Sequence, residues 1–245
     1  MAKGSVTGGT QTVTVSTLLF DVFGTVVDLH GSLNSATRSV LSANGADPEQ
    51  AQPLVETWLT NLNDLMTDVR SKRAAWTSHD ALTSDALHHA VTVLGMENLP
   101  RQALRNLASA THRLRPWPDS PRSLGTLADS FTVVALSNAS LAGLTRLSAA
   151  GGLRWHCVLS SQAVKTYKPD PAVYRLALDI LGLDPRTTMM VAAHEWDLHA
   201  AAEHGVATAF LSRPGEARAS SPGAFDVQAR DLSDLADQLA GRRLP

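Results

Sequence analysis

One short stretch, LLFDVFGTVVD at residues 18–28, constrains the fold more than any other part of the chain. It closes a β-rich apolar run, which predicts a strand over residues 13–20, and the run ends at Asp21, shortly before Gly24. An ionised carboxylate among apolar residues is costly unless it is paired or hydrogen-bonded. Asp21 is therefore either a turn residue beside Gly24 or a nucleophile held at the end of a buried strand. Which of these two interpretations holds depends on the motifs elsewhere in the chain.

The C-terminal half of the chain alternates strand-like and helix-like segments. Strands are expected in FTVVALSNAS, LRWHCVLSS, RTTMMVAAHEWD and VATAFLSRPG, which begin at residues 131, 153, 186 and 206. A helix over DPAVYRLALDILGL begins near Asp170, with Pro171 in its first turn, and a second helix ends at Gly205. This alternation predicts an α/β fold with a doubly wound, mostly parallel, Rossmann-like sheet.

Residues 31–116 interrupt this pattern with leucine, alanine and tryptophan at helical spacing. One helix is expected after Asp47-Pro48, and another has Thr83 or Ser84 as its N-cap and closes on Gly95. The sequence therefore predicts an all-helical insert between two parts of the sheet domain, residues 13–30 and 117–245. Residues 1–12 lack the apolar centre of a signal peptide and are expected to form a mobile tail.

Composition excludes several classes of protein. Hydrophobic residues make up 44% of the chain and charged residues 18%, which is typical of a globular protein with a core. The formal net charge is −2, so no basic excess indicates a nucleic-acid partner. The single cysteine excludes a disulfide within the chain and indicates a reducing compartment. No apolar run approaches the roughly 18 residues that cross a bilayer, so we expect a cytoplasmic protein without a membrane partner.

Groups able to do chemistry follow three of the expected strands. In a parallel sheet the carboxyl ends of the strands meet at one edge, where ligands bind. A nucleophilic carboxylate, hydrogen-bond donors, a cation and a second carboxylate there would suffice for covalent catalysis. The residues are Asp21 and Thr25, Ser137 and Asn138, Lys168, and His194 and Asp197.

In their order along the chain, Asp21, Ser137, Lys168 and Asp197 resemble the four motifs of the haloacid dehalogenase superfamily. The resemblance covers nearly the whole chain and implies that the helical insert, residues 31–116, is the cap domain of that family. Its magnesium-dependent phosphatases read Asp-x-Asp-Gly-Thr at the first motif, where the second Asp is the general acid and base. Phe23 stands at that position here, and a phenyl ring cannot protonate a leaving alkoxide, which disfavours a phosphatase.

The L-2-haloacid dehalogenase branch is more similar. It reads Asp-x-Tyr-Gly-Thr, Ser-Asn, Lys-Pro-Asp followed by a tyrosine, and Trp-Asp, and this chain has the matching residues Asp21, Phe23, Gly24, Thr25, Ser137, Asn138, Lys168, Pro169, Asp170, Tyr174, Trp196 and Asp197. Halide leaves without a proton, so dehalogenation does not need a general acid at the position of Phe23. The resemblance implies a pocket lined by Phe23, Asn138 and Trp196, with Tyr174 as a further substrate-binding candidate that completes the polar network.

This resemblance implies a hydrolase with two chemical steps. Asp21 displaces halide from carbon and forms an ester, and water then attacks the carbonyl carbon of that ester. Lys168 keeps Asp21 ionised, because a nearby cation lowers a carboxylate pKa. Asp197 orients Lys168 and the water, while Thr25 and Ser137 align the carboxylates.

The chain departs from the branch at the substrate grip. Leu59, after Trp58, stands where the family has an arginine that holds substrate and halide, and leucine cannot replace its bidentate grip. Trp58 is expected in the cap core or in the pocket wall. Ala192 and His194 replace a serine and an asparagine, and His194 with a pKa near neutrality would serve as a base for the water. Arg70 and Arg73 could reach in from the insert, although a solvated role is favoured for each.

These departures favour a larger or less acidic substrate than a short 2-haloacid. The alternatives left open are a phosphatase or related hydrolase of a pathway-specific metabolite, and a non-catalytic binding protein. No cofactor is expected for dehalogenation, and magnesium only for a phosphatase. The resemblance implies a small-molecule substrate and a possible homodimer.

Overall fold

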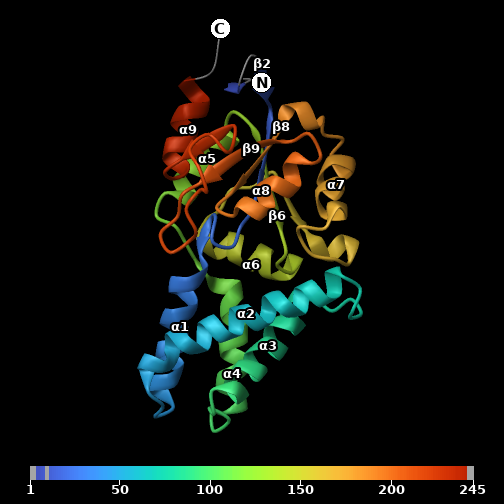
Figure 1. The fold of residues 1–245 in the computed structure, drawn as a ribbon. Helices are drawn as coiled ribbons and strands as arrows, with labels where there is room; N and C mark the ends of the chain where they lie inside the picture. The colour runs from blue at the N-terminus through green and yellow to red at the C-terminus, as the bar shows by residue number, and fades with distance from the viewer. Residues whose placement is uncertain (1–3, 9–10, 242–245) are drawn as a thin grey trace.

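The computed structural model describes residues 4–8 and 11–241, and it describes side chains within residues 15–240. A six-stranded parallel sheet with the order β10-β9-β8-β3-β6-β7 forms its centre (Figure 1). The strands are β1 (Gly4–Gly8), β2 (Gln11–Val15), β3 (Thr17–Phe20), β4 (Val27–Asp28), β5 (Arg115–Pro116), β6 (Thr132–Ser137), β7 (Cys157–Ser160), β8 (Thr188–Ala192), β9 (Ala207–Leu211) and β10 (Val227–Ala229).

Helices cover both faces of this sheet. The α-helices are α1 (Leu29–Ala43), α2 (Ala51–Arg70), α3 (His79–Val93), α4 (Arg101–Ala108), α5 (Ser120–Ala128), α6 (Leu141–Gly151), α7 (Pro171–Ile180), α8 (Glu195–Ala202) and α9 (Leu232–Gly241). Short 3-10 helices are η1 (Pro48–Gln50), η2 (Ser109–Arg113), η3 (Ser161–Val164) and η4 (Pro185–Thr187). The doubly wound α/β class predicted from the sequence is thus confirmed.

The apolar side chains of the central strand divide between the two faces because successive residues of a strand point in opposite directions. Leu18 and Phe20 belong to one buried cluster, which contains side chains of α5, α6 and α9. Leu19 belongs to the second cluster, which contains side chains of α7 and α8. Burial on both faces explains why β3 reads as a continuous apolar run.

Helices α1 to α4 form a separate group beside the carboxyl ends of the strands (Figure 1). The two connections to this helical block lie side by side, because β4 pairs with β5 in antiparallel fashion. Helices α2 and α3 pack against each other, and Trp58 of α2 donates from its indole N–H to the carbonyl of Thr83 at 2.8 Å. The block therefore covers the edge of the sheet where ligands are expected.

Several elements differ from the expectations. The strand expected over residues 13–20 is divided at Ser16 into β2 and β3. Within the tail expected over residues 1–12, the structure places β1 and the first two residues of β2, which pair as antiparallel strands, since alternating threonine and valine favour strand. Residues 1–3 and 9–10 lie outside the described residues. Helix α3 begins at His79 rather than near Thr83 or Ser84, because Ser78 accepts from the N–H of Ala81 and caps it. Strand β10 and helix α9 are further elements that were not expected from the sequence.

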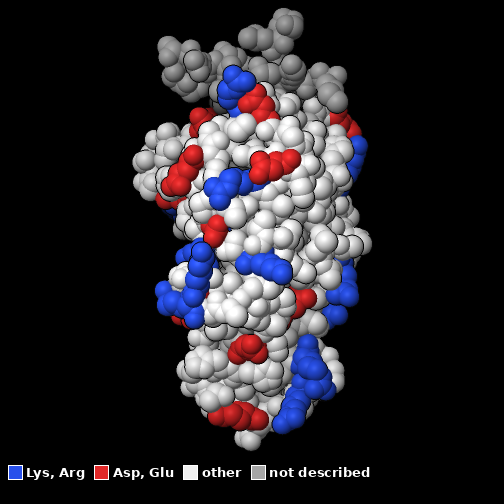
Figure 2. Space-filling view, turned by 90° about the vertical axis from the view of Figure 1, so that its right-hand side faces the viewer, with Lys and Arg blue, Asp and Glu red and all other residues white. Residues whose placement is uncertain are grey.

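The surface in Figure 2 shows positive and negative side chains interspersed, in keeping with the small net charge of −2. Within the part of the chain that the structure describes, no helix has the length and apolar character needed to cross a membrane.

Candidate active site

The carboxyl ends of three neighbouring strands, β8, β3 and β6, bring the expected site residues together. Asp21 directly follows β3, and its backbone N–H donates to the carbonyl of Val191 in β8 at 3.0 Å. Ser137 ends β6, on the other side of β3. His194 lies just beyond β8 and leads into α8. The switch in strand order around β3 thus creates the site, as is usual for open parallel sheets.

The Asp21 carboxylate is buried and accepts from three side chains. Thr25 Oγ1 donates to Oδ2 at 2.8 Å, and the Thr25 hydroxyl itself accepts from the N–H of Ala193 at 2.9 Å. Lys168 Nζ donates to Oδ1 at 2.9 Å. His194 Nδ1 lies 3.2 Å from Oδ2. The side chain of Asp21 is 8% exposed, so its charge is compensated by neighbours rather than by bulk water.

Lys168 connects Asp21 to the second carboxylate, Asp197. Its ammonium group donates to Asp197 Oδ2, and Asp197 Oδ1 accepts from the hydroxyl of Tyr174 at 2.6 Å. The side chains of Lys168 and Asp197 are 1% and 0% exposed. Tyr174 thus lies behind Asp197, away from the cavity, because α7 packs its ring into the second core cluster. The expectation that Tyr174 binds substrate is therefore not supported by its position, whereas its place in the polar network is.

Electrostatics keeps the candidate nucleophile ionised. Burial alone would raise the pKa of Asp21, but Lys168 and His194 outweigh it and hold this pKa well below its usual range. Burial likewise opposes the charge of Lys168, yet Asp197 and Asp21 together raise the Lys168 pKa. Burial raises the pKa of Asp197 despite Lys168. Two carboxylates around one ammonium group thus have pKa values that move in opposite directions.

Asn138, which follows β6, positions Lys168 rather than Asp21. Asn138 Oδ1 accepts from the backbone N–H of Lys168 at 2.7 Å, and its Nδ2 donates to the Lys168 carbonyl at 3.4 Å. The hydroxyl of Ser137 accepts from the N–H of Ala139 at 3.2 Å. This pair of interactions with Asn138 fixes the backbone from which Lys168 reaches Asp21.

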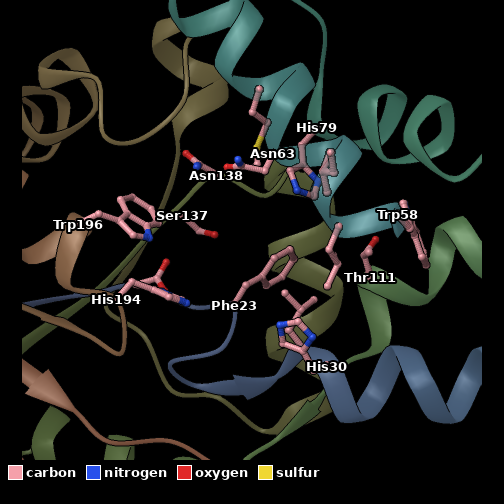
Figure 3. A pocket seen from close by; sticks show the side chains of 15 residues that line it. Phe23, His30, Trp58, Asn63, His79, Thr111, Ser137, Asn138, His194 and Trp196 are labelled. Atoms are coloured by element: carbon pink, nitrogen blue, oxygen red, sulfur yellow. The ribbon is translucent and has the colours of Figure 1, made fainter. Parts of the chain in front are cut away.

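A cavity of about 330 Å³ opens above Asp21 between the sheet and the helical block. Figure 3 shows Trp196, His194 and Ser137 on one side of it, Trp58 and Thr111 on the opposite side, and Phe23 between them. The residues that line it are Asp21, Phe23, Leu29, His30, Trp58, Leu59, Leu62, Asn63, Met66, His79, Thr111, Ser137, Asn138, His194 and Trp196. Among these described lining residues, none is lysine or arginine.

The helical block supplies an apolar wall. Trp58 and Leu59, both on α2, line the cavity, and Trp58 also belongs to the buried core cluster, so its side chain takes both of the positions considered for it. The Phe23 ring contacts the ring of His79 edge to face, with centroids 5.7 Å apart, and burial lowers the pKa of His79 to about 4. His79 therefore adds no positive charge near neutral pH.

The two arginines considered for the substrate grip lie elsewhere. Arg70 donates to the carbonyl of Lys168 at 3.5 Å and is absent from the residues that line the cavity. Arg73 pairs with Asp68 at the surface at 2.6 Å. Neither guanidinium replaces the arginine whose place Leu59 takes.

His194 has a second acidic partner, Glu216, which was not expected from the sequence. The Nε2 atom of His194 lies 3.3 Å from the carboxylate of Glu216, on the loop after β9. Burial alone would lower the pKa of His194, but its hydrogen bonds to Asp21 and Glu216 raise it to about 10 rather than leaving it near neutrality. In SRPGE, at residues 212–216, an acid after a Pro-Gly turn was the available signal for Glu216.

The arrangement is suited to nucleophilic chemistry by a carboxylate. Asp21 faces a cavity, is held ionised, and has a buried cation and a hydroxyl donor on its oxygens. Within residues 4–8 and 11–241, no group of three or more His, Cys, Asp or Glu side chains is placed to hold a metal ion.

Comparisons with known proteins agree with this geometry. The haloacid dehalogenase-like hydrolase family matches residues 15–205. (S)-2-haloacid dehalogenase 4A of Burkholderia cepacia is 30% identical, over 91% of this chain and 94% of its own. A defluorinating L-2-haloacid dehalogenase is similar in structure, with a TM-score of 0.86 and 31% identity over 93% of this chain and 96% of its own. A second L-2-haloacid dehalogenase gives a TM-score of 0.85 and 34% identity over 93% and 99% of the two chains.

Proposed function

The chain belongs to the haloacid dehalogenase-like hydrolases, on their L-2-haloacid dehalogenase branch, and from this premise we propose that it hydrolyses the carbon–halogen bond of a 2-haloacid-like substrate. One observation carries the proposal: the ionised Asp21 carboxylate faces the cavity while Lys168 and Thr25 hold its two oxygens. A group held in this way is a ready nucleophile.

In the first step, a carboxylate oxygen of Asp21 attacks the halogen-bearing carbon and halide leaves with the bonding electrons. An ester on Asp21 results. Because halide needs no proton, Phe23 is compatible with this step, whereas a phosphatase would need an acid at that position. The favourable electrostatics around Asp21 comes from Lys168, whose own charge Asp197 stabilises.

In the second step, water attacks the carbonyl carbon of the ester and releases the hydroxy acid. Lys168 and Asp197 stay in place behind the reacting carboxyl, where the ammonium group stabilises the negative charge that develops on oxygen. Asn138 keeps Lys168 aligned through the backbone. Tyr174 in turn fixes Asp197.

The substrate is larger or less acidic than a short 2-haloacid. Leu59 and Trp58 offer apolar contact where a carboxylate would need a cation, and the cavity of about 330 Å³ has room for an alkyl chain. Phe23 and Trp196 add aromatic surface beside the departing halide. Ser137 and Asn138 add uncharged polar groups to Asp21 and His194 on the sheet side of the cavity.

The helical block acts as the cap domain, residues 31–116, over a core domain of residues 13–30 and 117–245. Two observations support this division: the two connections pair with each other as β4 and β5, and a cavity lies between the two parts. A homodimer, a cytoplasmic location and independence of any cofactor stay predictions.

A halide-release assay tests the proposal. We expect the wild type to release halide from 2-chloro, 2-bromo or fluoro acids with EDTA present, and Asp21→Asn to release none, because an amide is a far weaker nucleophile. Asp85→Asn, on α3 and away from the cavity, is the matched control and should keep wild-type activity.

Absence of halide from folded wild-type protein across this panel would contradict the proposal. Phosphate release with magnesium would then favour the phosphatase alternative. Silence in both assays would favour a non-catalytic binding protein.

A further inference from the structure

His194 is held between two carboxylates. Its Nδ1 lies 3.2 Å from Asp21 Oδ2 and its Nε2 lies 3.3 Å from Glu216 Oε2. The ring also stacks on Trp196, with centroids 5.7 Å apart and an interplanar angle of 26°. The side chain of Glu216 is only 11% exposed. An acid that is nearly buried against a histidine, which itself contacts the nucleophile, requires a functional explanation.

The loop that carries Glu216 is fixed in position by hydrogen bonds, and the chain leaves space for the Glu216 carboxylate. Three residues earlier, the buried guanidinium of Arg213 donates to the carbonyl of Thr25 at 2.8 Å and to Asp119 at 2.8 and 3.0 Å. The N–H of Glu216 then donates to the carbonyl of Arg213 at 3.2 Å. A Cβ at Gly24, where φ is +77°, would lie 2.6 Å from Glu216 Oε1, so the glycine leaves room for the carboxylate.

We propose that Glu216 is a positioning residue that makes His194 the general base for hydrolysis of the Asp21 ester. The inference rests on the proposed function and adds to it a change in the protonation state of His194. The ring is protonated while Asp21 is a carboxylate and neutral once Asp21 is an ester.

The resting state follows from the charges around the ring. Asp21 and Glu216 face its two nitrogens, and with Trp196 stacked on one face, the other charged groups nearby, Lys168 and Asp197, lie beyond Asp21. The two carboxylates raise the pKa of His194 to about 10, so the free enzyme holds an imidazolium, which cannot accept a proton. Formation of the ester removes the charge of Asp21 and with it one of the two causes of this high pKa.

The protons and electrons of both steps balance. In the first step a C–O bond to Asp21 forms, the C–halogen bond breaks with its electrons on halide, and the imidazolium proton of His194 passes to solvent. In the second step a water oxygen bonds to Cγ of Asp21 and gives one proton to His194. The Cγ–O ester bond breaks, and the leaving oxygen takes the other proton of that water. Asp21 carboxylate and His194 imidazolium are restored.

Glu216 also selects the tautomer. A neutral His194 that donates from Nε2 to Glu216 has its lone pair on Nδ1, which is the nitrogen that faces Asp21. Without the acid, the other tautomer becomes accessible and the base is weaker. The expected defect is therefore in ester hydrolysis and not in halide displacement.

Glu216→Gln tests this with a longer-chain (S)-2-chloroalkanoate as the probe, in keeping with the substrate class proposed above. We expect one equivalent of chloride in a burst at near wild-type rate, followed by turnover slowed about 10²–10⁴-fold. Mass spectrometry should find the ester trapped on Asp21. The acid limb of the ester-hydrolysis rate should move to lower pH, because the remaining carboxylate that raises the His194 pKa is gone. Glu216→Asp should restore part of the turnover.

Glu195→Gln is the matched control. Glu195 accepts from the N–H of Ser220 at 2.6 Å, so it holds the loop that carries Glu216 but does not contact His194. This variant should keep both the burst and the turnover. A second measurement needs no variant: ¹⁵N shifts of the wild-type His194 ring should report an imidazolium at about pH 8.

The outcomes separate the two proposals. Equal loss of the burst and of turnover in Glu216→Gln, or a neutral His194 ring in the resting wild type, would overturn the role of Glu216 while leaving Asp21 as nucleophile. Chloride release by neither wild type nor variant, at any substrate of the panel, would overturn the proposed function and this inference with it.

Discussion

The loop from Asp21 to Thr25 shows how a carboxylate is accommodated at the end of an apolar strand. Thr25, one turn further on, donates to Asp21 and accepts from Ala193, so a single hydroxyl links the ends of β3 and β8. Gly24 adopts a φ of +77°, a conformation that L-residues with a side chain rarely take, and this reverses the chain tightly enough for the contact. The free-energy cost of burying the Asp21 carboxylate is offset by the hydrogen bond from Thr25 and by the ion pair with Lys168.

The raised pKa of His194 makes part of the folding stability pH-dependent. The folded-state value of about 10 exceeds the usual 6.5, so the stabilisation is complete below about pH 6.5 and is lost as the pH rises toward 10. We expect the wild type to lose about 1–3 kcal/mol of unfolding free energy between about pH 7 and pH 9, and His194→Gln to lose clearly less.

Urea unfolding at the two pH values measures this difference. His89→Gln, at an exposed position of α3, is the control and should keep the wild-type dependence. Equal losses in wild type and His194→Gln would show that the ion pairs of His194 contribute no stability.

At the scale of elements, the first turn of α3 joins the helical block to the sheet domain. Asp80 accepts from the hydroxyl of Ser140 at 2.9 Å on both oxygens and lies 3.0 Å from His112 Nε2. Ser140 is also the N-cap of α6 and accepts from the N–H of Gly143. One serine thus caps a helix of the core and binds an acid of the helical block, which fixes α3 relative to α6.

Asp80→Ala should loosen this contact. Loss of the hydrogen bonds of a charged group predicts a decrease of about 1–3 kcal/mol in the free energy of unfolding. Because α3 carries His79 into the cavity wall, KM for the haloacid should also rise. Urea unfolding and steady-state kinetics measure the two effects. Asp68→Ala removes an exposed ion pair with Arg73 and should change neither quantity by more than a small amount.

Elements with strong local signals could be predicted from the sequence. Helix α7 begins after Asp170 with Pro171 in its first turn, as expected, because both residues act within the helix itself. The sequence predicts too late a start for α3, since Ser78 follows residues without helical periodicity and its capping role depends on the chain around it. Short β10 has only three residues, too few for a pattern.

The residues of the candidate site also divide into those with a local sequence signal and those without one. Asp21 and Lys168 were predictable because strand ends converge on one edge of a parallel sheet. Glu216 was not, because it reaches His194 only through the anchor that Arg213 forms with Thr25 and Asp119, far apart in the sequence. The high pKa of His194 depends on the same contact with Glu216 and therefore has no local signal in the sequence.

At the scale of the whole molecule, charge and apolar surface come from different parts of the chain. The strand ends supply Asp21 and Lys168, whereas α2 supplies Trp58 and Leu59. The cavity between the two parts joins an ionised nucleophile to an apolar wall, which strengthens the electrostatic effect of Lys168 by excluding water. Affinity must then come mainly from the alkyl part of the substrate, since the described lining residues include no lysine or arginine and the charge of His194 is already paired with Asp21 and Glu216.

A series of 2-chloroalkanoates of increasing length tests this origin of affinity. Each methylene buried against α2 is worth about 0.8 kcal/mol, so KM should fall about two- to fourfold per added carbon until the cavity of about 330 Å³ is filled. Leu59→Arg should reverse the preference, because the guanidinium binds a carboxylate and occupies the space of the chain. Thr60→Arg adds the same charge at an exposed neighbour that does not line the cavity, and should keep the wild-type order. A KM in the wild type that is constant or rises with chain length would mean that the substrate is held by its carboxylate after all.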